Sequence, residues 1–142
     1  MKKKMPTDLN LAKNRLIRKN LSLVIVKDAK VLFETESHGI GDLLKAINKH
    51  RDDMKGTSVA DRIVGRAAAL LFVFSGVTSV FAVTASDGGI EVLKKNSVFC
   101  EYESRVTSVL NLRRIDVCPF EKLVAKLSSP EKAYEVLRAQ CG

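Results

Sequence analysis

The stretch TSVADRIVGR at residues 57–66 leads without a break into the apolar run AAALLFVF at residues 67–74. A helix that is apolar all round must be buried on every side, so this stretch predicts the central helix of the fold. Ser58 and Asp61 have the spacing of a capping box, which predicts that the helix begins at Ser58. Its first turns would then carry Asp61, Arg62 and Arg66, where free backbone N–H groups and the helix dipole favour an anion.

Length and composition indicate one globular domain. The chain has 142 residues, of which 28% are charged and 46% are hydrophobic, and these are ordinary values for such a domain. We expect a basic segment and helix at residues 1–20, a core at 21–127 and a C-terminal helix at 128–142. The net charge of +8 favours small acidic molecules or nucleic acid as partners. Basic and aromatic residues do not alternate, so nucleic acid is the less favoured partner.

Cysteine usage indicates a reducing compartment. Cys100, Cys118 and Cys141 are odd in number and widely spaced, and the sequence contains no CxxC. They match neither a disulfide framework nor a zinc signature. The sequence therefore predicts a cytoplasmic protein without a metal or cofactor, and it leaves the oligomeric state open.

Residues 67–86 contain no charged side chain, which is nearly the length of a membrane span. Ser75-Gly76 and Thr78-Ser79 interrupt this run, and the residues after Gly76 are rich in β-branched side chains. We therefore predict a buried helix, a turn at Gly76 and a buried strand, with no membrane association.

Hydrophobic periodicity and turn signals predict the other elements. Helices are expected at residues 7–19, 42–50, 90–95, 105–112, 116–127 and 131–139, and strands at residues 21–26, 31–35, 77–84 and 98–103. Residues 105–112 suit a strand as well as the favoured helix. A hairpin followed by alternating helices and strands predicts an α/β fold, a mixed sheet with helices on both faces. In such layers, ligands bind at the carboxyl ends of strands and the N-termini of helices.

The segments ADRIVGRAAA at residues 60–69 and CPFE at residues 118–121 together resemble a small prokaryotic family of uncharacterised proteins with a cytidine-deaminase-like fold. The family pattern has lysine in place of Arg62 and Arg66, and methionine in place of Phe120. The resemblance covers residues 21–127 and implies a three-layer α-β-α sandwich. It implies no particular activity, because none is established for the family.

Zinc-dependent deaminases carry H-x-E at one helix start and P-C-x-x-C at the next, and these supply the zinc ligands and a catalytic glutamate. We place these two motifs at residues 60–62 and 86–89, which read ADR and SDGG. One carboxylate cannot replace a His/Cys/Cys cluster, so the resemblance implies a deaminase-like fold without zinc. The two glycines of SDGG suit either a plain turn or a loop that approaches a phosphate.

The predicted site combines residues from both motifs, and each has a structural alternative. Asp61 is either a base at the mouth of a pocket or a helix cap. Cys118 is either a nucleophile activated at a helix start or a small buried side chain. Glu121 either works with Asp61 in acid–base chemistry or complements a helix dipole. The predicted ligand-binding residues are Arg62, Arg66, Asn111 and Arg113, of which Arg66 could also pair with Glu121.

The sequence thus predicts a pocket at the N-terminus of the central helix. We expect it to bind a small anionic, nucleotide-like molecule without zinc, and the sequence leaves open whether the molecule is also transformed. A non-catalytic ligand-binding module and a basic nucleic-acid-binding protein are the alternatives.

Overall fold

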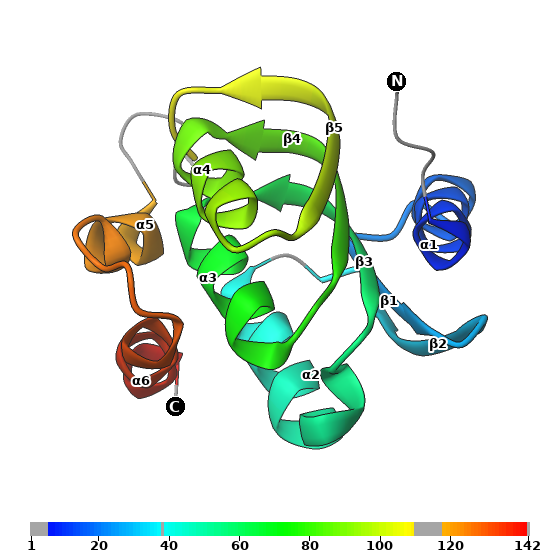
Figure 1. Ribbon diagram of the computed structural model, residues 1–142, viewed down its shortest axis with the longest axis horizontal. Helices are drawn as coiled ribbons and strands as arrows, with labels where there is room; N and C mark the ends of the chain where they lie inside the picture. Colours follow the sequence, from blue (N-terminus) through cyan, green and yellow to red (C-terminus); the bar gives the residue numbers. More distant parts are fainter. Residues whose placement is uncertain (1–5, 38, 110–117, 142) are drawn as a thin grey trace.

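A computed structural model describes residues 6–37, 39–109 and 118–141 of the chain (Figure 1). The elements are, in chain order, α1 Thr7–Arg18, β1 Leu23–Lys27, β2 Lys30–Thr35, α2 Ile40–His50, the 3-10 helix η1 Arg51–Met54, β3 Ser58–Val64, α3 Arg66–Ser75, β4 Ser79–Ser86, α4 Asp87–Lys95, β5 Phe99–Val106, α5 Pro119–Val124 and α6 Pro130–Cys141.

The five strands form one mixed sheet in the order β2-β1-β3-β4-β5. β1 pairs antiparallel with both β2 and β3, whereas β3, β4 and β5 run parallel to one another. Parallel neighbours need crossover connections, and α3 and α4 supply them. The predicted mixed sheet is therefore confirmed, with β3 as its middle strand.

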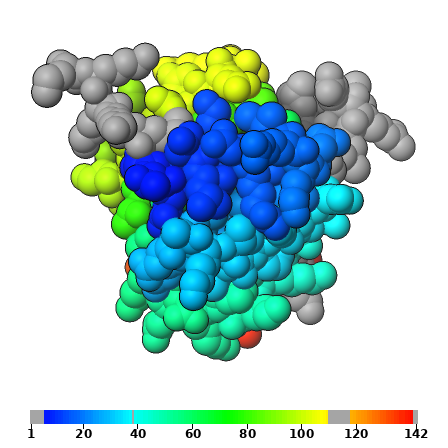
Figure 2. Space-filling model, turned by 90° about the vertical axis from the view of Figure 1, so that its right-hand side faces the viewer, coloured from blue at the N-terminus to red at the C-terminus, as the bar shows by residue number. Residues whose placement is uncertain are grey.

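Helices cover both faces of this sheet, which confirms the predicted three-layer α/β sandwich (Figure 1). On one face, Leu9, Ala12 and Leu16 of α1 pack against side chains of β1, β3 and β4. Figure 2 looks onto this face, where α1 lies above the β1–β2 hairpin. On the other face, α2 and α4 flank α3, and α5 and α6 pack on the outer side of α3.

The central helix is present as predicted, but it begins eight residues later than expected. α3 spans Arg66–Ser75, its apolar residues are buried almost all round, and it ends at Gly76, whose φ of 87° is left-handed. Residues 58–64 form the strand β3 instead of a first helical turn. Asp61 pairs with Leu23 of β1 and with Ala82 of β4. The capping-box prediction is wrong because Val59, Ile63 and Val64 suit a strand, and two neighbouring strands pair with it.

Three further expectations are corrected. The helix predicted for residues 105–112 is wrong at its start, since β5 continues to Val106 and residues 107–109 are not helical. The SDGG segment is a helix start rather than a loop, because Ser86 accepts a hydrogen bond from the Gly89 N–H and caps α4. The spacing of Leu9, Ala12, Leu16 and Ile17 predicts that these four apolar residues share one side of the first helix, but Ile17 is 48% exposed whereas the other three are buried.

In the part of the chain that the structure describes, no helix is both long and apolar enough to cross a membrane.

Candidate functional site

A cavity of about 600 Å³ opens where β3 ends and α3 begins. Its lining comprises residues 22 and 23 at the start of β1, residues 37, 39, 40, 42 and 43 around the start of α2, residues 61–63, 65 and 68 around the β3–α3 junction, residue 109, and residues 118–121 around the start of α5. Most of the lining is apolar. Its size and chemistry are those of small-molecule sites, which span roughly 300–1,000 Å³. It also lies where α/β layers bind their ligands.

The carboxyl group of Asp61 lies in an environment that raises its pKa. It is partly buried, and its Oδ1 accepts one long hydrogen bond of 3.4 Å from the Ile63 N–H. Among the described residues, no basic side chain forms an ion pair with it. Burial raises the pKa of Asp61 to about 7, against the opposing effect of the N–H groups of Ile63 and Arg62. A carboxyl with a pKa near neutrality can both take and give a proton, which is typical of functional sites.

Glu121 occupies the N-terminus of α3. Its Oε1 accepts a hydrogen bond from the Arg66 N–H and its Oε2 accepts one from the Ala67 N–H, each at 2.7 Å. These N–H groups have no partner within the helix, so the carboxylate satisfies both and lies at the positive end of the helix dipole. The anion at this helix start is therefore a side chain of the protein itself.

Arg66 holds the other end of α5. Its Nε donates to the carbonyls of Val124 and Leu127, each at 3.1 Å, and its Nη2 also donates to Leu127. One residue of α3 thus anchors α5 twice, through its backbone at Glu121 and through its guanidinium near the last turn. The side chain of Arg66 does not line the cavity, so the structure does not bring it to the predicted ligand.

Arg62 joins β3 to the end of α1. Its Nε donates to the Leu21 carbonyl at 2.8 Å, and its Nη2 donates to the Leu16 carbonyl at 3.3 Å and to Asn20 Oδ1 at 3.1 Å. Unlike Arg66, it lines the cavity. These bonds fix the guanidinium at the cavity wall.

Cys118 lies directly before α5 and lines the cavity together with Asp61. It is partly buried, and its N–H donates to the Val109 carbonyl at 2.8 Å. Two predicted catalytic residues from distant parts of the sequence therefore share one cavity with Glu121. No histidine belongs to the described lining, so the thiol has no imidazole partner there. Asn111 and Arg113 lie outside the described residues.

Sequence reasoning did not assign Ser22, Ser37 or Asp42 to the site, although all three line the cavity. The sequence around Asp42 indicates only the start of a helix. The polar loop before α2 was the available signal, but nothing in it indicated that α2 begins beside α3. Asp42, Asp61 and Glu121 outnumber Arg62 among the charged residues of the described lining.

The two segments that we compared with the zinc motifs do not lie at the helix starts beside the cavity. Residues 60–62 lie in β3 and residues 86–89 start α4, whereas the helices that begin at the cavity are α2, α3 and α5. The predicted correspondence is therefore wrong in place. Within the described residues, no three His, Cys, Asp or Glu side chains cluster closely enough to hold a metal ion.

Replacing Glu121 by alanine is expected to lower the free energy of unfolding by about 2 kcal/mol, because two N–H groups lose a charged acceptor in a partly buried place. Urea denaturation of the wild type and the variant measures this. The matched control is Glu135→Ala, which removes an exposed carboxylate from α6 and should change stability by less than about 0.5 kcal/mol. Equal effects of the two substitutions would contradict the structural role of Glu121.

The comparisons with known proteins identify relatives of unknown function and a fold. The family model described as "Domain of unknown function (DUF1893)" matches residues 11–140. A DUF1893 family protein from Thermotoga maritima has a similar structure, with a TM-score of 0.85 and 24% identity over 96% of this chain and 92% of that one. None of the curated proteins matches the sequence.

More distant structural similarity connects the chain to parts of larger proteins. RibD of Acinetobacter baumannii matches with a TM-score of 0.50 and 17% identity over 68% of this chain and 34% of RibD. A diaminohydroxyphosphoribosylaminopyrimidine deaminase/5-amino-6-(5-phosphoribosylamino)uracil reductase from Thermotoga maritima gives a TM-score of 0.49 and 15% identity over 58% and 29% of the two chains. The chain spans about a third of these proteins. The sheet order and the similarity to RibD agree with the predicted cytidine-deaminase-like fold.

Proposed function

This chain belongs to the DUF1893 family, and for this member we propose a small-molecule site in the cavity at the β3–α3 junction. The observation that carries the proposal is Asp61, a carboxyl without a basic partner among the described residues, whose pKa is raised to about 7 inside a mostly apolar cavity. Removing a carboxyl group from water costs stability. A residue that carries such a cost is more often kept for function than for folding.

The ligand that suits this cavity is a flat heterocycle of nucleobase size. A carboxyl that is partly protonated at neutral pH offers both a hydrogen-bond donor and an acceptor. The edge of a nucleobase-like ring offers the matching pair, and apolar side chains contact its faces. Ile63 and Phe120 belong to the lining and supply such apolar surface. We therefore propose a nucleobase-like or nucleotide-like ligand.

If the bound molecule is transformed, Asp61 and Cys118 are the residues we propose for the chemistry. Asp61 can move a proton at neutral pH, and the thiol of Cys118 lies in the same lining and can attack an electrophilic carbon. We propose that neither step uses zinc, since Cys118 is the only sulfur ligand in the described lining. A cavity that binds without turnover needs Asp61 alone.

A thermal-shift screen against nucleobases, nucleosides and nucleotides tests the proposal. A ligand at about a hundred times its Kd should add about 2.7 kcal/mol of stability to the wild type. We expect Asp61→Asn to weaken binding of the same ligand about tenfold, because asparagine cannot ionise and so cannot form the charge-assisted hydrogen bond that an ionised Asp61 accepts from a ring N–H.

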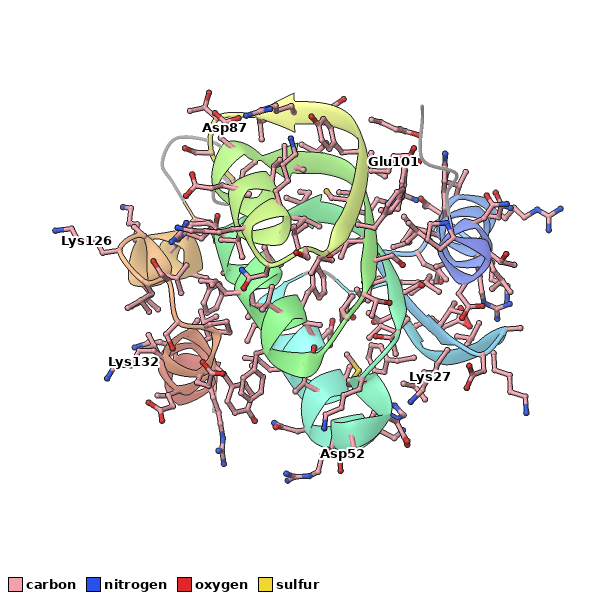
Figure 3. All side chains as sticks on the ribbon, viewed as in Figure 1. Lys27, Asp52, Asp87, Glu101, Lys126 and Lys132 are labelled. Atoms are coloured by element: carbon pink, nitrogen blue, oxygen red, sulfur yellow. The ribbon has the colours of Figure 1, made fainter. Side chains whose placement is uncertain are left out.

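The matched control is Asp52→Asn. The side chain of Asp52 is 96% exposed on η1, where it points to solvent away from α3 (Figure 3). This control should bind as the wild type does. Unchanged binding by Asp61→Asn would contradict the role of Asp61, and stoichiometric zinc in the purified protein would contradict the zinc-independent chemistry.

The net charge of +8 keeps nucleic-acid binding as a second proposal. Part of that charge lies on α1 and just after it, where Arg18 and Lys19 are exposed. A steep decrease of nucleic-acid affinity with salt would favour this alternative. A cytoplasmic location remains a prediction from the cysteine content.

A further inference from the structure

A second hollow of about 310 Å³ adjoins the cavity. Its lining is mostly polar and comprises Lys19, Asn20, Leu21, Ser22, Glu36 and Arg62. Ser22 and Arg62 also line the larger cavity, so the two hollows meet at these two residues. A ligand that occupies both hollows would have to pass Ser22 and Arg62.

The two hollows differ in charge. The described lining of the cavity holds Asp42, Asp61 and Glu121 against Arg62. The second hollow holds Lys19 and Arg62 against Glu36 alone. An anionic group is repelled by carboxylates within a few ångströms and attracted by the two cations. The cavity therefore favours the apolar part of a ligand, and the second hollow favours its anionic end.

Arg62 is already held in place to meet that end. Its Nε and Nη2 donate to Leu21, Leu16 and Asn20, and its backbone N–H donates to the Ser22 carbonyl at 3.1 Å. Among the described residues, no hydrogen bond uses the Nη1 of Arg62, so this group can donate to a ligand. A guanidinium whose position is fixed loses little conformational freedom when it binds a phosphate. Because Arg62 is partly buried, salt also screens it less than a surface charge.

The C-terminal end of α1 offsets part of the positive charge of Arg62 and Lys19. The Leu16 carbonyl, which accepts from Arg62, lies at the negative end of the helix dipole, and Lys19 follows the last turn. Glu36 adds a carboxylate at the rim. We therefore expect the second hollow to strengthen binding of a ligand held elsewhere more than to bind phosphate tightly by itself.

We propose that this hollow, defined by Lys19, Asn20 and Arg62, is an anion subsite for the phosphate ester of the ligand whose heterocycle lies in the cavity. The inference rests on the proposed function and makes it more specific, because it selects a nucleoside monophosphate over the free nucleoside.

NMR titrations of the isotope-labelled protein separate the two sites, since each has its own reporters. The Ile63 and Leu43 methyl groups report on the cavity, and the backbone amides of Lys19 and Asn20 report on the second hollow. The probes are inorganic pyrophosphate alone and matched pairs of a nucleoside with its 5′-monophosphate. We expect pyrophosphate at millimolar concentration to shift the second group alone. The monophosphate should shift both groups and bind about tenfold more tightly than its nucleoside.

Two variants test the residues. Arg62→Lys keeps the charge but loses the planar group, and Lys19→Gln removes an exposed charge, so each should reduce the advantage of the monophosphate, by about threefold for Lys19→Gln. Lys126→Gln is the control, because Lys126 follows α5 on the far side of the sheet from α1 (Figure 3). It should leave the advantage unchanged.

The outcomes separate the two proposals. Nucleoside shifts at Ile63 and Leu43 with no gain from the phosphate would overturn the subsite and keep the proposed function. Pyrophosphate shifts at Lys19 and Asn20 with no response of the cavity to any nucleoside would support an anion site and overturn the nucleobase-like ligand. Shifts at neither place would overturn both proposals. If the monophosphate still binds more tightly than its nucleoside in both variants, the subsite alone is overturned.

Discussion

Replacing Gly65 by alanine is expected to lower the free energy of unfolding by about 3 kcal/mol, although the backbone of this residue would accept alanine. Its φ of −101° and ψ of −169° are extended values that any residue adopts. A Cβ would lie 2.3 Å from Glu121 Oε1, 2.6 Å from Glu121 Cδ and 2.7 Å from Val109 Cγ2. The carboxylate would have to leave the start of α3, which costs two charged hydrogen bonds in addition to the steric strain.

Urea denaturation of Gly65→Ala measures this loss, and Gly41→Ala is its matched control. Gly41 lies in the first turn of α2, and a Cβ there would meet nothing within 4 Å. Alanine favours a helix over glycine, so we expect the control to gain about 0.5–1 kcal/mol. A loss in Gly41→Ala as large as that in Gly65→Ala would show that the close approach of Glu121 is not the cause.

The double variant Gly65→Ala/Glu121→Ala tests the mechanism further. Once the carboxylate is gone, only the contact with Val109 remains of the three named above, so the two losses should not add. We expect the double variant to be about 1 kcal/mol less stable than Glu121→Ala alone. Full additivity would contradict a steric effect that acts through Glu121.

The central helix could be predicted from the sequence because burial on all sides leaves a clear pattern. In a globular chain, an apolar run that ends at a glycine predicts a buried helix that stops there. The structure confirms both the helix α3 and its end at Gly76. Its start could not be predicted in the same way. β3 is an interior strand, where apolar residues do not simply alternate with polar ones. A capping-box spacing at Ser58 and Asp61 therefore competed with a strand signal that only the pairing with β1 and β4 resolves.

For the site, local sequence motifs predicted candidate residues, but not which distant residues they contact. Asp61, Cys118 and Glu121 were named from their motifs, and the structure brings all three to one cavity, while their chemical roles stay predictions. What each polar group contacts could not be predicted. The two arginines of one motif point to opposite partners, Arg62 to the end of α1 and Arg66 to the end of α5. These partners are far away in sequence, so they depend on the packing of the layers.

Replacing Asp61 by asparagine is expected to stabilise the protein at pH 8 by about 2 kcal/mol or more and to change little at pH 4. Burial raises the pKa of Asp61 from the ordinary 3.8 to about 7. The folded state therefore binds the proton more tightly than the unfolded chain, so stability falls as the pH rises from about 4 to about 7. The full difference is worth about 4 kcal/mol, and contact of the carboxyl with water in the cavity reduces it. Asparagine is never ionised and avoids this cost.

Urea denaturation of the wild type and Asp61→Asn at pH 4, 6 and 8 checks this sign. The difference between the two proteins isolates Asp61, because groups such as Glu34, whose pKa is lowered by its hydrogen bond to Arg15, are present in both. An increase of the difference with pH would show that the chain keeps an acidic group in the cavity at the expense of stability, as expected for a residue retained for function. A difference that is the same at all three pH values would mean that Asp61 is ionised like a surface carboxylate. The cavity would then have lost the observation on which its proposed function depends.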